Sequence, residues 1–534
     1  MTSSKEEARP ISTWAPLRSP VFRALWIAQL VSNLGTWMQT VGAQWMLVGD
    51  PRAAVLVPLV QTATTLPVVL LALPSGVLAD LVDRRRLLIA TQGAMAAGVG
   101  LLATLTGAGL TTPAVLLMLL FVVGCGQALT APAWQAIQPD LVPAEQIPAA
   151  AALGSMSMNG ARAIGPAIAG VLVSLSGPTL VFALNAVSFV GIVVVLVWWR
   201  RPAVERDYPP ERALAALSAG GRFIRSSPIV RRILLRTALF IGPASALWGL
   251  LPVIAANQLA LSSSGYGLLL GALGVGAVCG AFLLSRLRSR FGPNALLTVG
   301  AAGFAVTTVV LALVPIFAAV LAALVIGGAS WLLSLSTLNA SMQLNLPAWV
   351  RARGLSVYQL IFMGGQALGS VVWGVIAAST TSSTSLLVSA ALLVVCALSS
   401  TWWPLHEKTS SLDLTPSSHW PEPTLIFEPE PLDGPVLVLT SYRVAQADED
   451  AFLAAMAVLG RSRQRTGASQ WRLFRSVERE STFVETFVVR SWGEHTLQHY
   501  TRLTGQDLVI EQAVEKYIDG VPVSEHYLAV RDRR

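Results

Sequence analysis

The sequence predicts an all-α membrane protein with twelve transmembrane helices in two six-helix halves, followed by a small C-terminal α+β domain of βαββαβ order. Hydrophobic residues make up 54% of the 534 residues and charged residues only 12%, which is more apolar surface than a soluble core of this size can bury. Residues 22–403 divide into about twelve apolar runs of membrane-spanning length. Residues 435–534 instead alternate short strand patterns with amphipathic helix patterns.

The elements follow a simple order along the chain. Residues 1–21 contain no apolar core before a small-residue cleavage site, so we expect a cytoplasmic segment and no removable signal peptide. The apolar runs are expected to be helices, because in hydrocarbon a backbone amide finds no partner outside its own segment. We expect a six-helix bundle at 22–200, a cytoplasmic central linker at 201–228, a second bundle at 229–403, a flexible linker at 404–434 and a cytoplasmic ferredoxin-like domain at 435–534.

The positive charges predict the orientation. Alternate loops carry clusters of arginine, such as Arg84 to Arg86 and Arg286 to Arg290, whereas the loops between them carry almost none. By the positive-inside rule both termini are cytoplasmic, in a multi-pass membrane protein. Residues 1–405 have a net charge of +13 and residues 406–534 of −5. The excess of basic residues therefore lies in loops that face anionic membrane lipid, and we expect no nucleic-acid partner.

An internal repeat supports the division into halves. Shifted by 204 residues, "MNGARAIGPAIAGVL" at 158–172 falls on "FMGGQALGSVVWGVI" at 362–376, and four small residues coincide. Membrane transporters are often built from such duplicated bundles. The repeat predicts that the fifth transmembrane helix is equivalent to the eleventh.

Two signatures resemble the major facilitator superfamily of secondary transporters. The loop "GVLADLVDRRR" is similar to the cytoplasmic signature of that family, and the resemblance implies a conformational joint formed by Gly76, Asp80, Arg84 and Arg85. The stretch "ARAIGPAIAG" is similar to the antiporter signature of helix five and adds Gly165, Pro166 and Gly170 to the switch residues. A topogenic basic loop with a capping aspartate, and simple close packing of small residues, are the alternative explanations.

Within that superfamily, residues 22–403 most resemble the bacterial efflux permeases that include the enterobactin exporters, with "SNLGTWMQTVGAQWML" and "APAWQAIQPDLVP" as the similar stretches. The resemblance implies secondary active export of a small organic molecule, such as a siderophore, metabolite or drug, across the bacterial inner (plasma) membrane by alternating access. A transporter-like membrane sensor that signals through its cytoplasmic tail is the alternative. We expect neither enzyme activity nor a cofactor.

Polar residues follow one face of the first helix at spacings of three and four, which predicts a stripe that faces a central cavity. Polar or aromatic residues on helices four, five, ten and eleven are expected to join it. The predicted substrate-binding residues are Gln29, Asn33, Thr36, Thr40, Trp134, Gln135, Arg162, Asn339 and Gln366. Hydrogen bonds between neighbouring helices are the alternative role for the amides.

Arg162 is the only formal charge between Pro148 and Ser174. A guanidinium at this depth costs about 2.5–3.5 kcal/mol on insertion scales and therefore needs a partner. Every acidic residue of 1–405 lies in a loop or near a helix end. Cavity water, amide or backbone oxygens and an anionic substrate remain as partners, so the sequence leaves both a structural and a substrate-binding role open.

The C-terminal domain resembles the small dimeric α/β-barrel domains of the antibiotic-biosynthesis monooxygenase type. A cofactor-free monooxygenase, a small-ligand sensor and a dimerisation or regulatory module are the competing roles, of which we favour the non-enzymatic module and expect a homodimer through this domain. His495 and His499 lie four residues apart, but no further ligand at suitable spacing accompanies them, so we expect no metal site.

Overall fold

The computed structural model describes residues 12–199, 213–405, 413, 415, 417, 420 and 425–530. The chain divides into two compact units. Unit 1 comprises Met1–Pro210, Arg236–Thr337 and Gln359–Pro404, and unit 2 comprises Glu211–Leu235, Leu338–Tyr358 and Leu405–Arg534.

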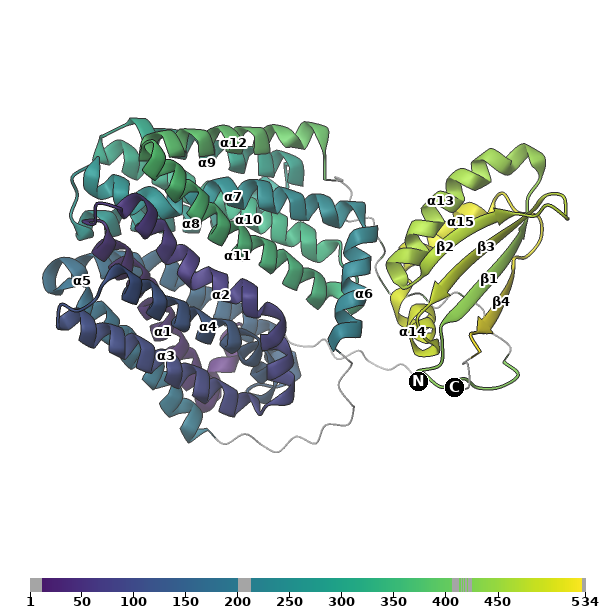
Figure 1. Cartoon of the computed structure of the whole chain (residues 1–534), viewed down its shortest axis with the longest axis horizontal. Coiled ribbons are helices and arrows are strands. Elements are labelled where there is room, and N and C mark those ends of the chain that lie inside the picture. The colour runs from purple at the N-terminus through teal and green to yellow at the C-terminus, as the bar shows by residue number, and fades with distance from the viewer. Residues whose placement is uncertain are drawn as a thin grey trace, which may run out of the picture. The chain divides into compact units, whose positions relative to one another are not determined.

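Long helices build the membrane part of the chain. Figure 1 shows one group formed by the helices of the first half and another formed by the helices of the second half. The first group consists of α1 (Pro20–Leu47), α2 (Ala53–Leu81), α3 (Arg84–Gly107), α4 (Pro113–Ile137) and α5 (Ile147–Trp198). The second consists of α7 (Pro228–Asn257), α8 (Ser263–Arg288), α9 (Pro293–Leu313), α10 (Phe317–Leu344), α11 (Ala348–Ser379) and α12 (Ser382–Trp402). The helix α6 (Ala213–Ser226) lies in the predicted central linker.

Ten helices in the described part of the chain are long and apolar enough to cross a membrane. One of them, α5, is in fact two helices, because Gly177 has a φ of 74° and interrupts the helical backbone there. A residue with a side chain rarely adopts this conformation, so glycine suits the break. The helix α1 is not among the ten because its glutamine, asparagine and threonine residues lower its hydropathy. With α5 counted as two and α1 included, the predicted twelve helices are present.

Helix starts in the bundle follow ordinary capping rules. Ser19, Thr112 and Thr381 each precede a helix, and each side chain accepts a hydrogen bond from a backbone N–H of the first turn. Asp83 does the same for α3 by accepting from the backbone N–H of Arg86. These caps satisfy amides that have no partner within the helix, which fixes the ends of the spans close to the predicted loops.

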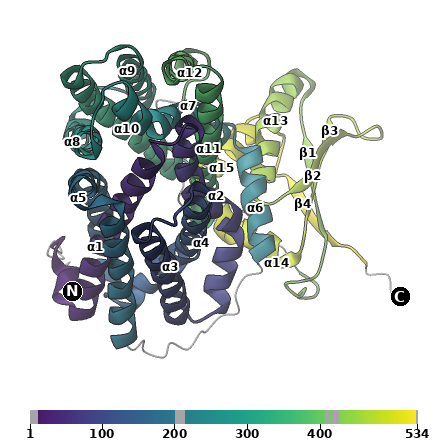
Figure 2. The same ribbon diagram turned by 60° about the vertical axis from the view of Figure 1, so that its left-hand side comes forward.

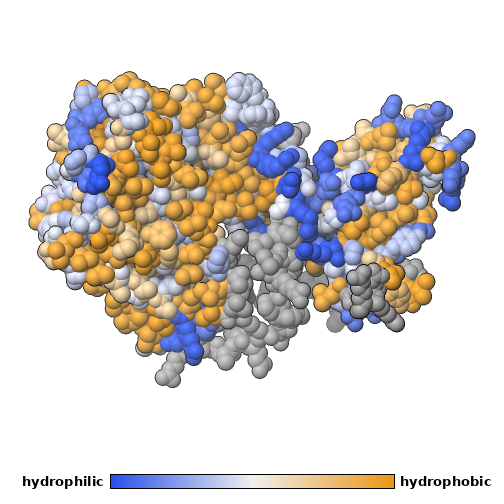
Figure 3. All heavy atoms as spheres, viewed as in Figure 1, coloured by the Kyte–Doolittle hydropathy of each residue, from blue (hydrophilic) through white to orange (hydrophobic). Residues whose placement is uncertain are grey.

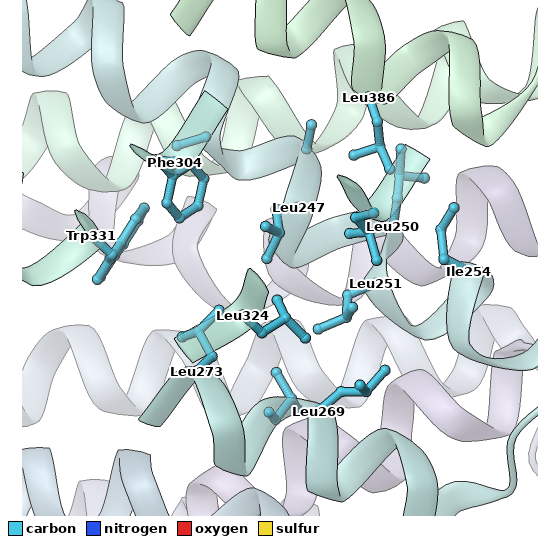
Figure 4. Packing of buried hydrophobic residues seen from close by; sticks show 14 of the residues in the cluster. Leu247, Leu250, Leu251, Ile254, Leu269, Leu273, Phe304, Leu324, Trp331 and Leu386 are labelled. Carbon is cyan, nitrogen blue, oxygen red and sulfur yellow. The ribbon is translucent and has the colours of Figure 1, made fainter. Parts of the chain in front are cut away.

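The largest apolar core lies among the helices of the second half. Figure 4 shows leucines of α7 and α8 packed toward side chains of α9, α10 and α12, among them Phe304, Trp331 and Leu386. Many large apolar side chains are exposed as well, for example Leu175, Phe282 and Leu368. Figure 3 shows that apolar residues cover most of the visible face of the bundle. Such a surface is expected where lipid replaces water as the solvent.

The C-terminal part of unit 2, here called the tail domain (residues 425–530), has the predicted order of strands and helices. Its four-stranded antiparallel sheet has the order β2-β3-β1-β4, with β1 (Val436–Arg443), β2 (Ser469–Arg475), β3 (Thr482–Val489) and β4 (Val523–Leu528). The helices α13 (Glu449–Thr466), α14 (Trp492–Leu497) and α15 (Gly505–Glu515) lie on one face of the sheet in Figure 2. The strands β1 and β2, which α13 connects, are separated in the sheet by β3, as expected of a ferredoxin-like sandwich.

A cluster of aromatic rings surrounds His495 in the tail domain. His495 is 2% exposed, and its ring lies 4.8 Å from that of His526 on β4 and 5.4 Å from that of Trp492. Burial, assisted by His526 and His499, lowers the pKa of His495 to about 3. The imidazole therefore stays neutral in the folded domain at neutral pH.

We expect this neutral imidazole to make the tail domain less stable in acid. An unfolded chain binds a proton to His495 near pH 6.5, whereas the folded domain binds it only near pH 3, so stability falls as pH drops through that window. Between pH 7 and pH 5 the expected loss is about 2 kcal/mol. Hydrogen exchange of the β1 and β3 amides, corrected for the intrinsic pH dependence of exchange, measures it.

The matched variant is His495→Gln, which keeps a polar side chain but cannot titrate. It should lose most of the slope, with the remainder attributed to His526, whose pKa is also lowered by burial and by His499. An unchanged slope in this variant would show that the acid sensitivity has another source.

Candidate functional site

A cavity of about 470 Å³ lies inside unit 1, between the two groups of helices. Both halves line it, with side chains from α1, α2, α3, α4 and α5 and from α7, α10 and α11. Its lining residues are Gln29, Ser32, Asn33, Thr36, Trp37, Gln39, Thr40, Gln61, Thr64, Thr65, Val68, Gln92, Met95, Gln127, Thr130, Ala131, Trp134, Gln135, Met158, Arg162, Phe189, Trp248, Trp331, Gln359, Phe362, Met363 and Gln366. Its size falls in the range of small-molecule sites in proteins.

The polar stripe of α1 forms one wall of this cavity. The side-chain amide of Gln29 donates to Asn33 Oδ1 over 3.0 Å, and the amide of Asn33 donates to Ser157 Oγ on α5 over 3.1 Å. The hydroxyls of Thr36 and Thr40 donate to carbonyls one turn earlier in the same helix. The stripe therefore lines the cavity, and its Asn33 also bonds a neighbouring helix.

Arg162 reaches the cavity from α5. Its guanidinium carbon lies 5.4 Å from the ring centre of Trp37 on α1, a cation–π distance. Its Nε has no hydrogen-bond partner among the described residues. The described lining contains no aspartate or glutamate. The described cavity lining therefore carries one positive charge and no carboxylate that balances it.

Aromatic side chains form the wall that belongs to the second half. Trp248 on α7 lies 6.3 Å from Trp37 and 5.4 Å from Trp331 on α10, and Trp331 lies 6.4 Å from Phe362 on α11. The indole N–H groups of Trp248 and Trp331 are buried and, in the described structure, donate to no protein acceptor. Two donors are thus held next to the cavity with their hydrogen-bonding capacity unused.

Eight of the nine predicted substrate-binding residues lie in the lining, and only Asn339 does not. Asn339 is exposed, belongs to unit 2, and accepts a hydrogen bond of 2.6 Å from the side chain of Gln343 one turn later. The prediction that Asn339 lines the cavity is wrong. Helix ten presents Trp331 to the cavity, two turns before Asn339. The role of the other eight in binding a substrate remains a prediction.

The sequence analysis missed several residues of the site. It did not single out the tryptophans Trp37, Trp248 and Trp331, because an aromatic residue in an apolar helix has the same pattern as a core residue. It also missed Gln61, whose amide donates to Gln366 Oε1 across the two halves over 3.3 Å. A glutamine in the middle of the membrane-spanning α2, followed by Thr62, Thr64 and Thr65, was the signal that would have found it.

The predicted joint after helix two is described only in part. The surroundings of Gly76 and the side chain of Asp80 lie outside the described part of the structure. Arg85 donates from Nε to the carbonyl of Leu196 over 2.7 Å and from Nη2 to that of Val197 over 2.9 Å. These carbonyls belong to the last turn of α5, where a cation is stabilised by the helix dipole. Arg85 thus ties α3 to the end of α5, and the switching role of Gly76, Asp80, Arg84 and Arg85 stays a prediction.

The glycines of the helix-five signature allow two close helix contacts. A Cβ on Gly165 would lie 2.9 Å from Trp37 Cβ on α1. A Cβ on Gly170 would lie 2.6 Å from the carbonyl oxygen of Ser263 and 2.8 Å from Gly267 Cα, both on α8. Each distance is shorter than a side chain tolerates, so the two glycines are required for this packing. Gly170 therefore brings the first half directly against the second.

Further contacts close the same end of the bundle, which carries residues 48–52 and 258–262. The Tyr266 hydroxyl on α8 donates to Gln44 Oε1 on α1 over 2.7 Å, and its ring stacks on Trp45 with centres 5.8 Å apart. At this end Gly249 on α7 also approaches Pro58 on α2. The opposite wall of the cavity reaches Trp134 and Gln135, in the last turn of α4.

The comparison that decides the family covers nearly the whole chain. The sequence model described as "Transmembrane secretion effector" matches residues 11–534. The chain belongs to the transmembrane secretion effector family. The match includes the tail domain, so both parts of the chain are characteristic of this family.

Relatives of the chain with curated names support the same assignment. The chain is 28% identical over 366 residues to the enterobactin exporter EntS of Citrobacter koseri, and 27% identical over 364 residues to EntS of Salmonella typhi. Each alignment covers 67% of this chain and 86% of the relative. These relatives are exporters. The chain is a multi-pass membrane transporter of the major facilitator superfamily.

Solved structures agree with this fold. A bacterial homologue of the human lysosomal transporter Spinster, in an inward-facing and unoccupied conformation, aligns with a TM-score of 0.58 and 16% identity over 73% of this chain and 96% of its own. A variant of the nucleoside transporter NupG aligns with a TM-score of 0.59 and 14% identity over 72% of this chain and 99% of its own. At these identities the likeness concerns the fold alone.

Proposed function

We propose that the protein exports a small anionic aromatic compound across the bacterial inner membrane by alternating access, with both termini on the cytoplasmic side. The observation that carries the proposal is the 470 Å³ cavity with the unbalanced guanidinium of Arg162 at its wall. The predicted substrate-binding and switch residues keep their roles within this proposal.

The charge of the cavity favours an anion. A guanidinium deep in a membrane protein is costly unless an oxygen acceptor or a counter-charge satisfies it. Arg162 has an uncompensated Nε and no acidic neighbour in the described lining. A carboxylate on the substrate would meet the planar fork of the guanidinium with two parallel hydrogen bonds, and a phenolate would accept through its single oxygen. The described lining therefore lacks the anionic oxygen acceptor that such a substrate would bring to Arg162.

The remaining lining favours an aromatic body. Trp37, Trp248, Trp331 and Phe362 offer ring faces for stacking and two unused indole donors. The amides around the opposite wall donate and accept, as an oxygen-rich compound requires. Because the relatives are enterobactin exporters, enterobactin is the first candidate to be tested.

Contacts at one end of the bundle indicate the direction of transport. The contacts of Gly170 with Gly267 and of Tyr266 with Gln44 join the halves at the end opposite the arginine-rich loops. If those loops are cytoplasmic, as the positive-inside rule indicates, this arrangement corresponds to a state that loads from the cytoplasm. Export then requires the glycine contact to open while the arginine-rich end closes.

Pairing of two copies through the tail domain is also part of the proposal. Leu437 on β1 and Tyr527 on β4 lie opposite each other on the sheet face away from the helices, and both are exposed. The mass of the purified protein in detergent measures the pairing, and a monomeric mass would refute it.

Transport by purified protein in liposomes tests the main proposal. Vesicles with the protein inserted in one orientation should move radiolabelled enterobactin faster than empty vesicles. They should accumulate it when the arginine-rich face, which is the expected loading side, lies outside, and lose it when that face lies inside. Substrate binding without flux under any ion gradient would instead favour a membrane sensor.

A further inference from the structure

A second cavity, of about 250 Å³, lies inside the tail domain. The sheet contributes Thr440, Tyr442 and Phe487 to its lining, and α13 and α15 contribute Arg463 and Glu511. The cavity is thus enclosed between the two layers of the sandwich. All of its lining residues belong to unit 2, and the export mechanism uses none of them.

Charged groups inside this cavity satisfy one another. Arg463 is 7% exposed, its Nε lies 3.3 Å from Glu485 Oε1, and its Nη1 pairs with Glu511. Glu485 is fully buried and also accepts from the Tyr442 hydroxyl over 2.6 Å and from the indole of Trp471 over 2.7 Å. Two carboxylates face one guanidinium, so the surroundings of the cavity carry excess negative charge. An anionic ligand is therefore disfavoured in this cavity.

The linker after the membrane helices supplies one wall. Trp420 follows the end of α12 at Trp402 and lines the cavity. Its indole N–H donates to Glu511 Oε1 over 2.8 Å, and its ring stacks on Arg463, whose guanidinium carbon lies 4.6 Å from the ring centre. The chain itself thus places a flat aromatic group with an N–H donor against this carboxylate and guanidinium.

The size and the remaining groups narrow the ligand further. A cavity of about 150 Å³ accommodates benzene, so about 250 Å³ of space suits two fused rings beside Trp420. Thr440 and Ser524 share a hydrogen bond of 3.0 Å at the lining, and His526 stands next to them on β4. Burial and His499 lower the pKa of His526, so it is a neutral imidazole at neutral pH and adds no positive charge.

We propose that the tail domain is a second small-molecule site, which takes a neutral or cationic bicyclic aromatic compound with a hydrogen-bond donor and excludes carboxylates. The ring stacks beside Trp420 and its donor meets the oxygens of Glu511 or of the Thr440–Ser524 pair. This site differs in charge preference from the membrane cavity, and it stands whether or not the proposed export substrate is correct. Binding there would hold the linker residue Trp420 against the domain.

The test uses the full-length protein in lipid nanodiscs with 5-fluorotryptophan in place of tryptophan. Loss of one ¹⁹F resonance in the Trp420→Phe variant assigns the signal of Trp420. Titration with 2-naphthol should shift this signal saturably, whereas 2-naphthoate, of nearly equal size but anionic, should leave it unmoved. Because Trp420 packs against Arg463 and Glu511 of the tail domain, partition of naphthol into lipid does not imitate binding.

Two variants of neighbouring β4 residues give the matched comparison. Ser524→Phe adds a ring on the cavity side of the strand and should weaken naphthol binding at least tenfold. Glu525→Phe adds the same ring on the opposite side and should leave binding unchanged. Unchanged exchange protection of the β1 amides in both variants shows that the domain remains folded.

Three results would overturn the proposal. The Trp420 signal would not respond to naphthol, or the response would persist with equal affinity in Ser524→Phe, or naphthoate would bind as well as naphthol. The first two exclude the site, and the third excludes its charge selection. None of them depends on transport activity, so failure of the export proposal would be seen separately.

Discussion

Replacing Arg162 by glutamine should lower the export of an anionic aromatic substrate by about ten- to a hundredfold. A hydrogen bond to a charged group contributes about 1.5–3 kcal/mol, and about 1.4 kcal/mol corresponds to a factor of ten. Initial rates in proteoliposomes at substrate concentrations below saturation measure the loss. Glutamine removes the charge without leaving a large void, so the variant should be produced at normal levels.

The reason for this large effect is the position of the charge. Arg162 lies fifteen residues after the first residue of α5, which at about 1.5 Å per residue places it near the bilayer centre. Its guanidinium faces Trp37 and the cavity, and the described lining has no carboxylate. A substrate anion is then the group best able to repay the desolvation of the guanidinium.

Two controls separate charge from packing. Arg162→Lys keeps the charge but loses the planar fork, so it should retain part of the activity. Arg286→Gln removes a charge from an exposed residue at the end of α8 and should leave the rate unchanged. Normal export by Arg162→Gln would show that the guanidinium is structural. Equal loss in Arg286→Gln would show that the effect arises from net charge.

The sequence predicted the polar wall of the cavity well, for a physical reason. Gln29, Asn33, Thr36 and Thr40 repeat with helical spacing in an apolar helix, and polar groups in lipid must face protein or water. The same argument located Arg162, because a lone charge cannot face acyl chains. Where the periodicity is strong and the solvent is apolar, the sequence constrains the direction of a side chain.

The aromatic wall could not be predicted in this way. Trp248 and Trp331 are as apolar as the leucines around them, so only packing decides which of these residues reaches the cavity. Asn339 was placed wrongly because polarity alone does not specify a partner: its amide is satisfied by Gln343 one turn away. The tight contact of Gly170 with Gly267 could not be predicted either, because it depends on a helix distant in sequence.

Gly170→Val should abolish export almost completely and shift the protein away from the arrangement described here. The added Cβ would meet the backbone of Ser263 and Gly267 at 2.6 and 2.8 Å, and backbone atoms cannot move aside as a flexible side chain can. Overpacking of this kind costs about 1–3 kcal/mol, or about five- to a hundred-and-fiftyfold in an equilibrium between two states. The halves then separate at the end that carries residues 48–52 and 258–262.

Labelling of a single cysteine measures this shift. In a protein with Cys125, Cys279 and Cys396 replaced by serine, Thr40→Cys places a thiol at the cavity wall. An impermeant maleimide added from the side of residues 48–52 should label it at least tenfold faster in the Gly170→Val protein. Opening this end exposes the cavity to a reagent that the closed glycine contact otherwise excludes.

Gly160→Val is the matched control, because it makes the same change in the same helix at a glycine whose added Cβ would meet nothing within 4 Å. It should transport and label as the parent protein does. If Gly160→Val were equally inactive, the loss would reflect valine in helix five and not the contact with α8. If Gly170→Val transported normally, the close approach of Gly170 to Gly267 would not be part of the transport cycle, because a cycle that must re-form this contact cannot tolerate the added side chain.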